Sequence, residues 1–289
     1  MLATRKCLRL VATVLWLTQG LALRGAAADA NWPAVQSLAA RLPCQLKIFT
    51  VGGRKAFLLL PNGSRAPVLP WVWYAPTLSS PPDASHEWMF GQWLNHGIAI
   101  AGVDVGESFG NPAGRAGFTA LYEKLTGEMR LALKACLLAQ SRGGLMHYNW
   151  AAENPGRVAC IVGIYPVCNL RSWPGLAQAA PAYGMTEQAF SVHVAEHNPI
   201  DRLAPLARAR VPILHLHGDR DTVVPLERNS RVVAERYHQL GGDMQLIVVP
   251  GRGHQVCPEF FHSQTLVDFV IAHSGAGDRE RSGTIPARK

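Results

Sequence analysis

Helix-length segments alternate with short apolar segments through much of this 289-residue chain. Three times a helix-length segment is followed by a short apolar run: 121–134 by 135–140, 143–153 by 158–163, and 226–240 by 245–249. Neighbouring parallel strands need a crossover connection, and strands covered on both faces are apolar throughout. The alternation therefore predicts an α/β fold with a mostly parallel central sheet and helices on both faces.

The segment from Leu46 to Pro61 adds an antiparallel edge to this sheet. Two short apolar stretches flank Gly52 and Gly53 there, which is the pattern of a hairpin. Further strands are expected at 68–74, 98–103 and 212–217, with helices near 85–96 and 261–273. Together these elements predict one α/β domain over residues 31–273.

Residues 169–209 break the alternation. Four prolines there prevent one long helix and leave two short helical stretches between them: Pro174, Pro181, Pro199 and Pro205. We expect this segment to form a small lid inserted before the strand at 212–217. Residues 274–289 carry Gly, Ser and charge without an apolar period, so we expect them to be disordered.

The N-terminus has the order of a secretory signal peptide. Basic residues at 5–9 precede an apolar run at 10–23 and an A-x-A cleavage site at 26–30. The alternative is a membrane anchor, but polar residues at 18–19 interrupt the run, which is shorter than the roughly 20 residues that a spanning helix needs. We expect residues 1–30 to be removed, leaving a secreted or periplasmic protein with no stable membrane insertion.

Charge and cysteine content exclude several kinds of partner. The formal net charge of +8 falls when the basic leader is removed, and the remaining Lys and Arg are scattered, so we expect no nucleic-acid partner. The cysteines after the leader are five: Cys44, Cys136, Cys160, Cys168 and Cys257. Their odd number leaves at least one thiol free. No pair has metal-ligand spacing, and we expect neither a metal nor another cofactor. We interpret Cys136 and Cys160 as buried small apolar residues.

Ser141 lies where the apolar run ending at Ala139 meets the start of a helix. Serine is a poor nucleophile at neutral pH, so an enzyme must expose it and supply a base held in one tautomer. A strained strand-turn-helix with small neighbours exposes a serine in the pattern G-x-S-x-G. Here Ala139 replaces the first glycine and Gly143 is the second. A lone serine at such a turn is more often a helix N-cap, so its assignment as nucleophile depends on its partners.

Candidate partners follow the next strands. Asp219 and Asp221 come directly after the strand at 212–217, and catalytic loops gather at the carboxyl ends of parallel strands. Asp219 follows a glycine in a tight turn, where Asp commonly bonds its own backbone, so Asp221 is the better orienting acid. His254 ends a Gly-rich loop after the next strand and is our predicted general base. We interpret His215 and His217, in or beside a strand, as packed or supporting residues.

The three segments resemble the α/β-hydrolase family over roughly residues 68–273. The stretch 217–225, with Asn198-Pro199 ahead of it, is most similar to the prolyl-oligopeptidase-like and carbohydrate-esterase branches. The resemblance implies the α/β-hydrolase fold and a catalytic triad of Ser141, Asp221 and His254.

An oxyanion hole is also implied by the resemblance. One donor would be the backbone N–H of Arg142, after the nucleophile. The second comes from the loop after an early strand, here 73–76, where Pro76 has no N–H. Either the phenol of Tyr74 supplies it, as a tyrosine does in prolyl-oligopeptidase relatives, or another backbone group does. The alternative is that Tyr74 is a packed strand end.

Arg142 is an unusual residue for this place, because the first turn of a helix carries a partial positive charge. An acidic neighbour could offset it, with Glu107 as a candidate. A substrate carboxylate could do so instead, because the Ser-Arg pair resembles that of glucuronoyl esterases, although Ala139-Gln140 departs from the Gly-Cys found there. A planar guanidinium can bind a carboxylate with two hydrogen bonds. Arg142 and Glu107 are therefore candidate substrate-binding residues.

We predict a secreted serine esterase that acts on carbohydrate esters, with a small-molecule or polysaccharide ester as substrate. The chain is expected to be exported and to lack the large additional domain with which oligopeptidases screen peptides. An exported prolyl-oligopeptidase-like serine peptidase would share every catalytic residue. A catalytically silent binding module of the same fold would lack a triad member. The acyl group, the alcohol and the oligomeric state stay open.

Overall fold

The computed structural model describes residues 31–64 and 66–276. The expected leader at 1–30, and positions 277–289 of the expected disordered tail, lie outside the described residues. Within the described part of the chain, no helix combines the length and apolar character that crossing a membrane requires.

The described elements alternate as the sequence predicts. The strands are β1 (Cys44–Val51), β2 (Arg54–Pro61), β3 (Trp71–Ala75), β4 (Ala99–Val103), β5 (Ala135–Gln140), β6 (Val158–Ile164), β7 (Ile213–Gly218) and β8 (Met244–Val249). The α-helices are α1 (Pro33–Ala39), α2 (Glu87–Asn95), α3 (Pro112–Gly127), α4 (Gly143–Glu153), α5 (Leu176–Ala179), α6 (Glu187–His193), α7 (Ala204–Arg208), α8 (Ser230–Gln239), α9 (Pro258–Phe261) and α10 (Gln264–His273).

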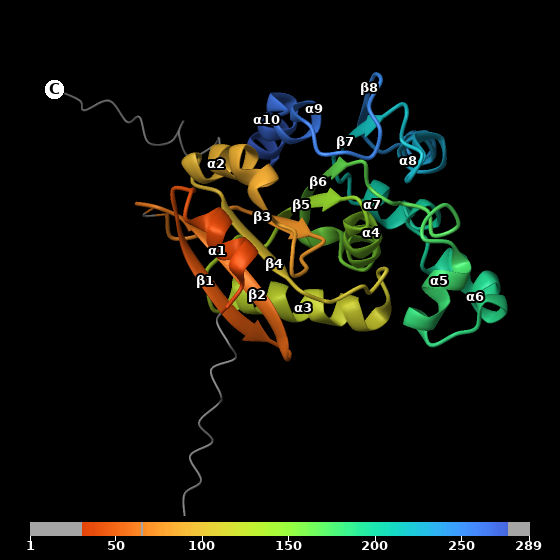
Figure 1. Cartoon of the computed structure of the whole chain (residues 1–289), viewed down its shortest axis with the longest axis horizontal. Coiled ribbons are helices and arrows are strands. Elements are labelled where there is room, and N and C mark those ends of the chain that lie inside the picture. The colour runs from red at the N-terminus through yellow and green to blue at the C-terminus, as the bar shows by residue number, and fades with distance from the viewer. Residues whose placement is uncertain (1–30, 65, 277–289) are drawn as a thin grey trace, which may run out of the picture.

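The strands form one eight-stranded sheet in the order β1-β2-β4-β3-β5-β6-β7-β8 (Figure 1). β1 pairs with β2 and β2 with β4 in antiparallel fashion, and all other neighbours are parallel. The predicted mostly parallel α/β sheet with an antiparallel edge is therefore confirmed.

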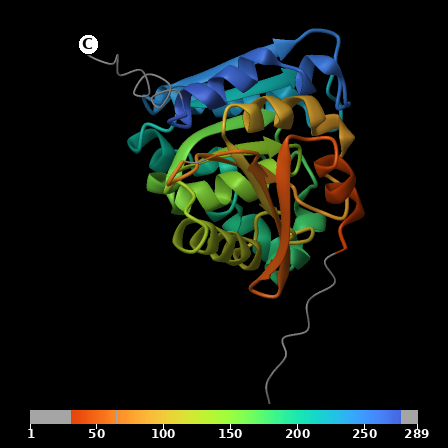
Figure 2. The ribbon, with the colours of Figure 1, turned by 90° about the vertical axis from the view of Figure 1, so that its left-hand side faces the viewer.

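Alternate strand residues face two helix layers, as the period of two in a strand requires. Trp71 and Trp73 of β3 pack in a core with α3, α4, α7 and α8. Val72 and Tyr74 pack in a second core with α1, α2, α9 and α10. The sheet is thus covered on both faces, which explains why its parallel strands are apolar throughout (Figures 1 and 2).

Two helices differ clearly from the sequence-based expectation. The helix expected at 121–134 runs from Pro112 to Gly127 instead. It starts early because the Asn111 side chain accepts a hydrogen bond from Gly114 N–H and proline suits the first helical turn. The helix expected at 261–273 is divided into α9 and α10, and Ser263 caps the second of them.

Residues 169–209 form α5, α6, α7 and short 3₁₀ turns. In Figure 1, α5 and α6 lie together beyond α4, at the side of the molecule opposite β1. A third apolar cluster, which includes Phe109, Leu145 and Phe190, holds them to the domain. Movement of this segment as a lid stays a prediction.

All five cysteines of the described chain are free thiols. Cys136 and Cys160 are buried opposite each other on β5 and β6, as expected for small apolar residues.

Gly143 lets α4 start directly against β3. A Cβ atom on Gly143 would lie 2.0 Å from the carbonyl oxygen of Ala75. We expect Gly143→Ala to lower the melting temperature, because relieving this overlap costs about 1–3 kcal/mol, the usual range for overpacking. Gly127→Ala is the matched control, since a Cβ there meets nothing within 4 Å. Equal melting temperatures for the two variants, measured by calorimetry, would show that the close approach is not required.

Candidate active site

The three residues of the predicted triad lie together at the carboxyl edge of the sheet. Ser141 follows β5, Asp221 follows β7 and His254 follows β8. The Oγ atom of Ser141 is 2.9 Å from Nε2 of His254, and Nδ1 of His254 is 2.8 Å from Oδ2 of Asp221. These parallel strands all end at the same edge of the sheet, which brings the distant positions into one hydrogen-bonded line.

Ser141 is held in a strained turn between β5 and α4. Its φ of +48° lies in the left-handed region, which is uncommon for a residue with a side chain. The backbone N–H of Ser141 donates to Ile164 O at 3.0 Å, and its carbonyl accepts from Val167 N–H at 2.8 Å. The N-cap of α4 is Arg142, so the alternative interpretation of Ser141 as a helix cap is wrong. The turn has the geometry of a nucleophile elbow.

Asp221 is 5% exposed, and both of its carboxylate oxygens accept hydrogen bonds. Oδ1 accepts from the backbone N–H groups of Val223 and Val224 at 3.0 and 2.8 Å, while Oδ2 accepts from His254. Burial alone would raise the pKa of Asp221, but hydrogen bonds from His217, His254 and Val224 outweigh it and hold the pKa below its usual range. The acid is therefore ionised and fixed in direction.

Asp219 does not bond its own turn, contrary to our expectation. Its Oδ1 accepts a hydrogen bond of 2.6 Å from the backbone N–H of Gly251, in the loop that carries His254. The local turn is made by Asp221 instead, through Val223 and Val224. Asp219 thus ties the loop of the histidine to the loop of the acid.

His254 has one tautomer that fits both of its partners. A carboxylate only accepts, so Nδ1 carries the proton given to Asp221, and Nε2 is free to accept from Ser141. The ring of Tyr165 packs against the imidazole with centroids 4.3 Å apart. Tyr165 was missed by the sequence analysis, and the signal that could have found it is its place directly after β6.

Tyr74, our candidate oxyanion donor, does not reach the cavity beside Ser141. It is fully buried in β3 and donates its hydroxyl hydrogen bond to Oε1 of Gln140 at 2.7 Å. Nε2 of the buried His86 lies 2.8 Å from the same oxygen. The structure therefore corrects the assignment of Tyr74, and the alternative of a packed strand end describes it.

A cavity of about 340 Å³ opens beside Ser141. Its lining comes from the loop after β3, the elbow, Tyr165 and the histidine loop: Pro76, Leu78, Ser80, Pro81, Gln140, Ser141, Arg142, Tyr165, His254, Gln255 and Val256. No residue of 169–209 is part of this lining. Among the described residues, no cluster of His, Cys, Asp and Glu could hold a metal ion.

Arg142 has an acidic neighbour, which was one of the two explanations for its position. Its guanidinium forms an ion pair with Glu107, in the loop after β4, and lies 5.1 Å from the ring centre of Trp173. Burial raises the pKa of Glu107, while the charge of Arg142 acts against that rise. A substrate carboxylate would have to displace Glu107, so substrate binding by Arg142 and Glu107 stays a prediction.

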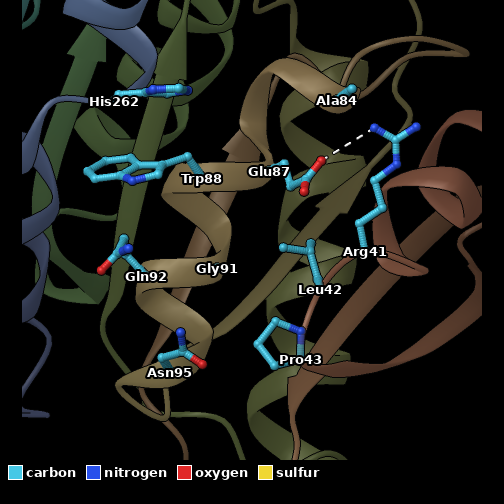
Figure 3. Close-up of a pocket in the computed structure, with 10 residues that line it drawn as sticks. All are labelled: Arg41, Leu42, Pro43, Ala84, Glu87, Trp88, Gly91, Gln92, Asn95 and His262. Atoms are coloured by element: carbon cyan, nitrogen blue, oxygen red, sulfur yellow. Dashed lines mark hydrogen bonds and ion pairs between the residues drawn. The ribbon is translucent and has the colours of Figure 1, made fainter.

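A second hollow, of about 420 Å³, lies between the end of α1 and α2 (Figure 3). Trp88 stacks on His262 there with centroids 5.3 Å apart, and Glu87 points toward Arg41 at 3.4 Å. Its lining contains no Ser, Cys or Thr. The candidate reaction site is therefore the cavity beside Ser141.

The sheet order and the three strand-end residues define an α/β-hydrolase. Within that class, the model of the prolyl oligopeptidase family matches residues 132–272, a range that holds Ser141, Asp221 and His254. The sequence-based resemblance to the prolyl-oligopeptidase-like branch is thereby confirmed. No protein of curated function shows significant sequence similarity to the chain.

Solved peptidase structures share the fold. A protein described as a dipeptidyl aminopeptidase IV from Bacteroides ovatus is 13% identical with a TM-score of 0.62, over 79% of this chain and 35% of its own. Dipeptidyl peptidase 4 of Porphyromonas gingivalis is 14% identical with a TM-score of 0.64, over 80% and 36%. A puromycin-hydrolyzing peptidase of Mycobacterium tuberculosis is 16% identical with a TM-score of 0.58, over 81% and 40%. This chain thus spans well under half the length of these relatives.

Substitution by asparagine distinguishes the roles of Asp219 and Asp221. Asp221→Asn should lower kcat by about 10⁴-fold with the fold intact, because the amide holds the wrong imidazole tautomer. Asp219→Asn is the matched control, since its amide oxygen can still accept from Gly251, and we expect turnover within a few-fold of the parent. Steady-state kinetics and thermal melting on both variants measure this. Loss of turnover in Asp219→Asn alone would reverse the assignment.

Proposed function

We propose that this protein is a serine peptidase that cleaves short peptides by acyl transfer through Ser141. The observation that carries the proposal is the unbroken hydrogen-bonded line from Ser141 through His254 to Asp221 at the edge of a cavity. All three members of the line are present, which argues against a catalytically silent module. The family match over these residues favours the peptidase over the carbohydrate esterase that was our main sequence-based prediction.

In the proposed reaction, Ser141 Oγ attacks the substrate carbonyl while His254 Nε2 takes its proton. Asp221 stabilises the imidazolium, since its charge lies 2.8 Å from Nδ1. The oxygen that becomes negative would face the backbone N–H of Arg142, which makes no hydrogen bond within the described residues. His254 then gives the proton to the leaving amine, which leaves an acyl group on Ser141. A water molecule, deprotonated by His254, attacks this acyl group and releases the acid, and Ser141 regains its proton.

The size of the cavity supports a short substrate. A volume of about 340 Å³ lies near the lower end of the range for small-molecule pockets, about 300–1,000 Å³. Leu78, Pro81 and Val256 give it apolar walls, while Gln140 and Gln255 offer polar groups. Such a pocket suits one or two residues of a peptide. Export by the N-terminal leader is part of this proposal and stays a prediction.

Ser141→Ala should lower kcat by roughly 10⁴-fold or more on aminoacyl and dipeptidyl nitroanilides. His254→Ala should do the same, and the double variant should be little worse than either single one, because the two residues act as a unit. Ser64→Ala, in an exposed loop, is the control and should keep the parent rate.

The same kinetic assays separate the peptidase from the esterase. Acetyl, feruloyl and uronoyl esters should be turned over with lower kcat/KM than the best peptide substrate. Ester turnover that depends on Ser141 with no peptide cleavage would contradict the peptidase proposal and restore the carbohydrate esterase. Turnover that survives in Ser141→Ala would overturn the nucleophile itself.

A further inference from the structure

A buried row of polar side chains leads from the interior to Asp221. Tyr148 Oη is 2.7 Å from His215 Nε2, and His215 Nδ1 is 2.9 Å from Ser230 Oγ. Ser230 Oγ is also 2.8 Å from His217 Nδ1. These four side chains are at most 1% exposed. The last of them, His217, places Nε2 at 3.4 Å from Oδ2 of Asp221.

The fold brings this row together in a simple way. His215 and His217 are two residues apart on β7, so their side chains stand on the same face of the sheet. Ser230 is the first residue of α8, and its hydroxyl lies within hydrogen-bond distance of both rings. Tyr148 reaches His215 from α4. A buried polar row of this kind is stable only when every group has a partner.

The directions of the hydrogen bonds in this row can be assigned from Val224, the partner of His217. His217 Nε2 lies 2.8 Å from the carbonyl oxygen of Val224, which can only accept, so Nε2 carries a proton. In an imidazole with one proton, Nδ1 then accepts from the Ser230 hydroxyl, 2.8 Å away. Ser230 Oγ in turn accepts from His215 Nδ1–H, and His215 Nε2 accepts from Tyr148. Burial lowers the pKa of His215 to about 3, which keeps that ring neutral.

The N–H of His217 therefore lies beside Oδ2 of Asp221, the same oxygen that accepts from His254. Its proton goes to Val224 O at 2.8 Å, with Oδ2 of Asp221 further away at 3.4 Å. Val224 also donates its own N–H to Asp221 Oδ1 at 2.8 Å. His217 thus holds the short loop 221–224, whose backbone orients the Asp221 carboxylate toward the imidazole of His254.

We propose that His217 is a positioning residue for the reaction, which holds Asp221 in the direction that His254 needs. It acts through Val224, whose carbonyl oxygen accepts from His217 Nε2–H, and through the closeness of that same N–H to Oδ2 of Asp221. The carbonyl oxygen of Val224 fixes the tautomer of His217, and the Ser230 hydroxyl lies against its Nδ1. This inference rests on the proposed catalytic role of Ser141, His254 and Asp221. It adds a residue that contacts neither substrate nor nucleophile.

The test compares three variants in the full chain. His217→Leu removes the N–H, and we expect kcat to fall about 10- to 100-fold with KM nearly unchanged, by analogy with the loss of groups that orient metal-binding histidines. His217→Gln can place an amide N–H near the position of Nε2 and should recover most of the loss. Tyr148→Phe removes a hydroxyl at the far end of the same row, and kcat should stay within a few-fold of the parent.

Two readouts separate positioning from plain stability. Melting temperature should fall in both His217→Leu and Tyr148→Phe, because each leaves a buried group without its partner. The proton resonance of His254 Nδ1, followed by NMR, should move or broaden only in His217→Leu. If His217→Leu does not fold, Ser230→Ala takes its place, since it frees His217 Nδ1 with little loss of volume, and it should lower kcat more than Tyr148→Phe.

Parent-like kcat in folded His217→Leu would overturn the proposal, as would an equal loss of kcat in Tyr148→Phe. No rescue by His217→Gln together with an unchanged His254 resonance would also overturn it. These outcomes are distinct from failure of the proposed function, which would appear as turnover in the parent that does not require Ser141.

Discussion

The hydrogen bond between Asp221 and His254 is the interaction on which the rest of the site depends. Asp221 is 5% exposed, and burying a carboxylate is costly unless its oxygens accept hydrogen bonds. Here the backbone N–H groups of Val223 and Val224 donate to one oxygen, and His254 donates to the other. The same bond selects the imidazole tautomer, because Nδ1 must carry the proton and Nε2 must be the acceptor. Without it, the 2.9 Å contact between His254 and Ser141 would have no defined direction.

The sheet makes that hydrogen bond possible. β7 and β8 are parallel neighbours, so the loops after them leave the sheet side by side. Asp219 joins the two loops through Gly251, and Gly218 lets the backbone at Arg252 approach, because a Cβ there would lie 2.0 Å from Arg252 O. The loops after these two adjacent parallel strands thus set the distance from acid to base, as is usual at the carboxyl edge of such a sheet.

Much of the fold and the line of three residues could be predicted, because they depend on local pattern. Apolar runs mark the strands, and Ser141, Asp221 and His254 each follow one. Tyr74 could not be predicted correctly, since its pattern does not show whether a strand-end side chain reaches a cavity or packs beneath it. The pairing of Arg142 with Glu107 was one of two open explanations, and only the position of the loop after β4 shows that this pair forms. Tyr165, His86, Ser230 and Tyr148 belong to no motif, so only tertiary contacts reveal them.

The central claim is that Ser141 is activated by His254 within this arrangement. Labelling of the purified protein with a fluorophosphonate, followed by mass spectrometry of its peptides, tests it most directly, because the probe reacts with an activated serine and needs no knowledge of the substrate. We predict one label per chain, on Ser141, in the folded protein, and its loss in His254→Ala. A label on another serine, or labelling of Ser141 that is unchanged in His254→Ala, would contradict activation of Ser141 by His254.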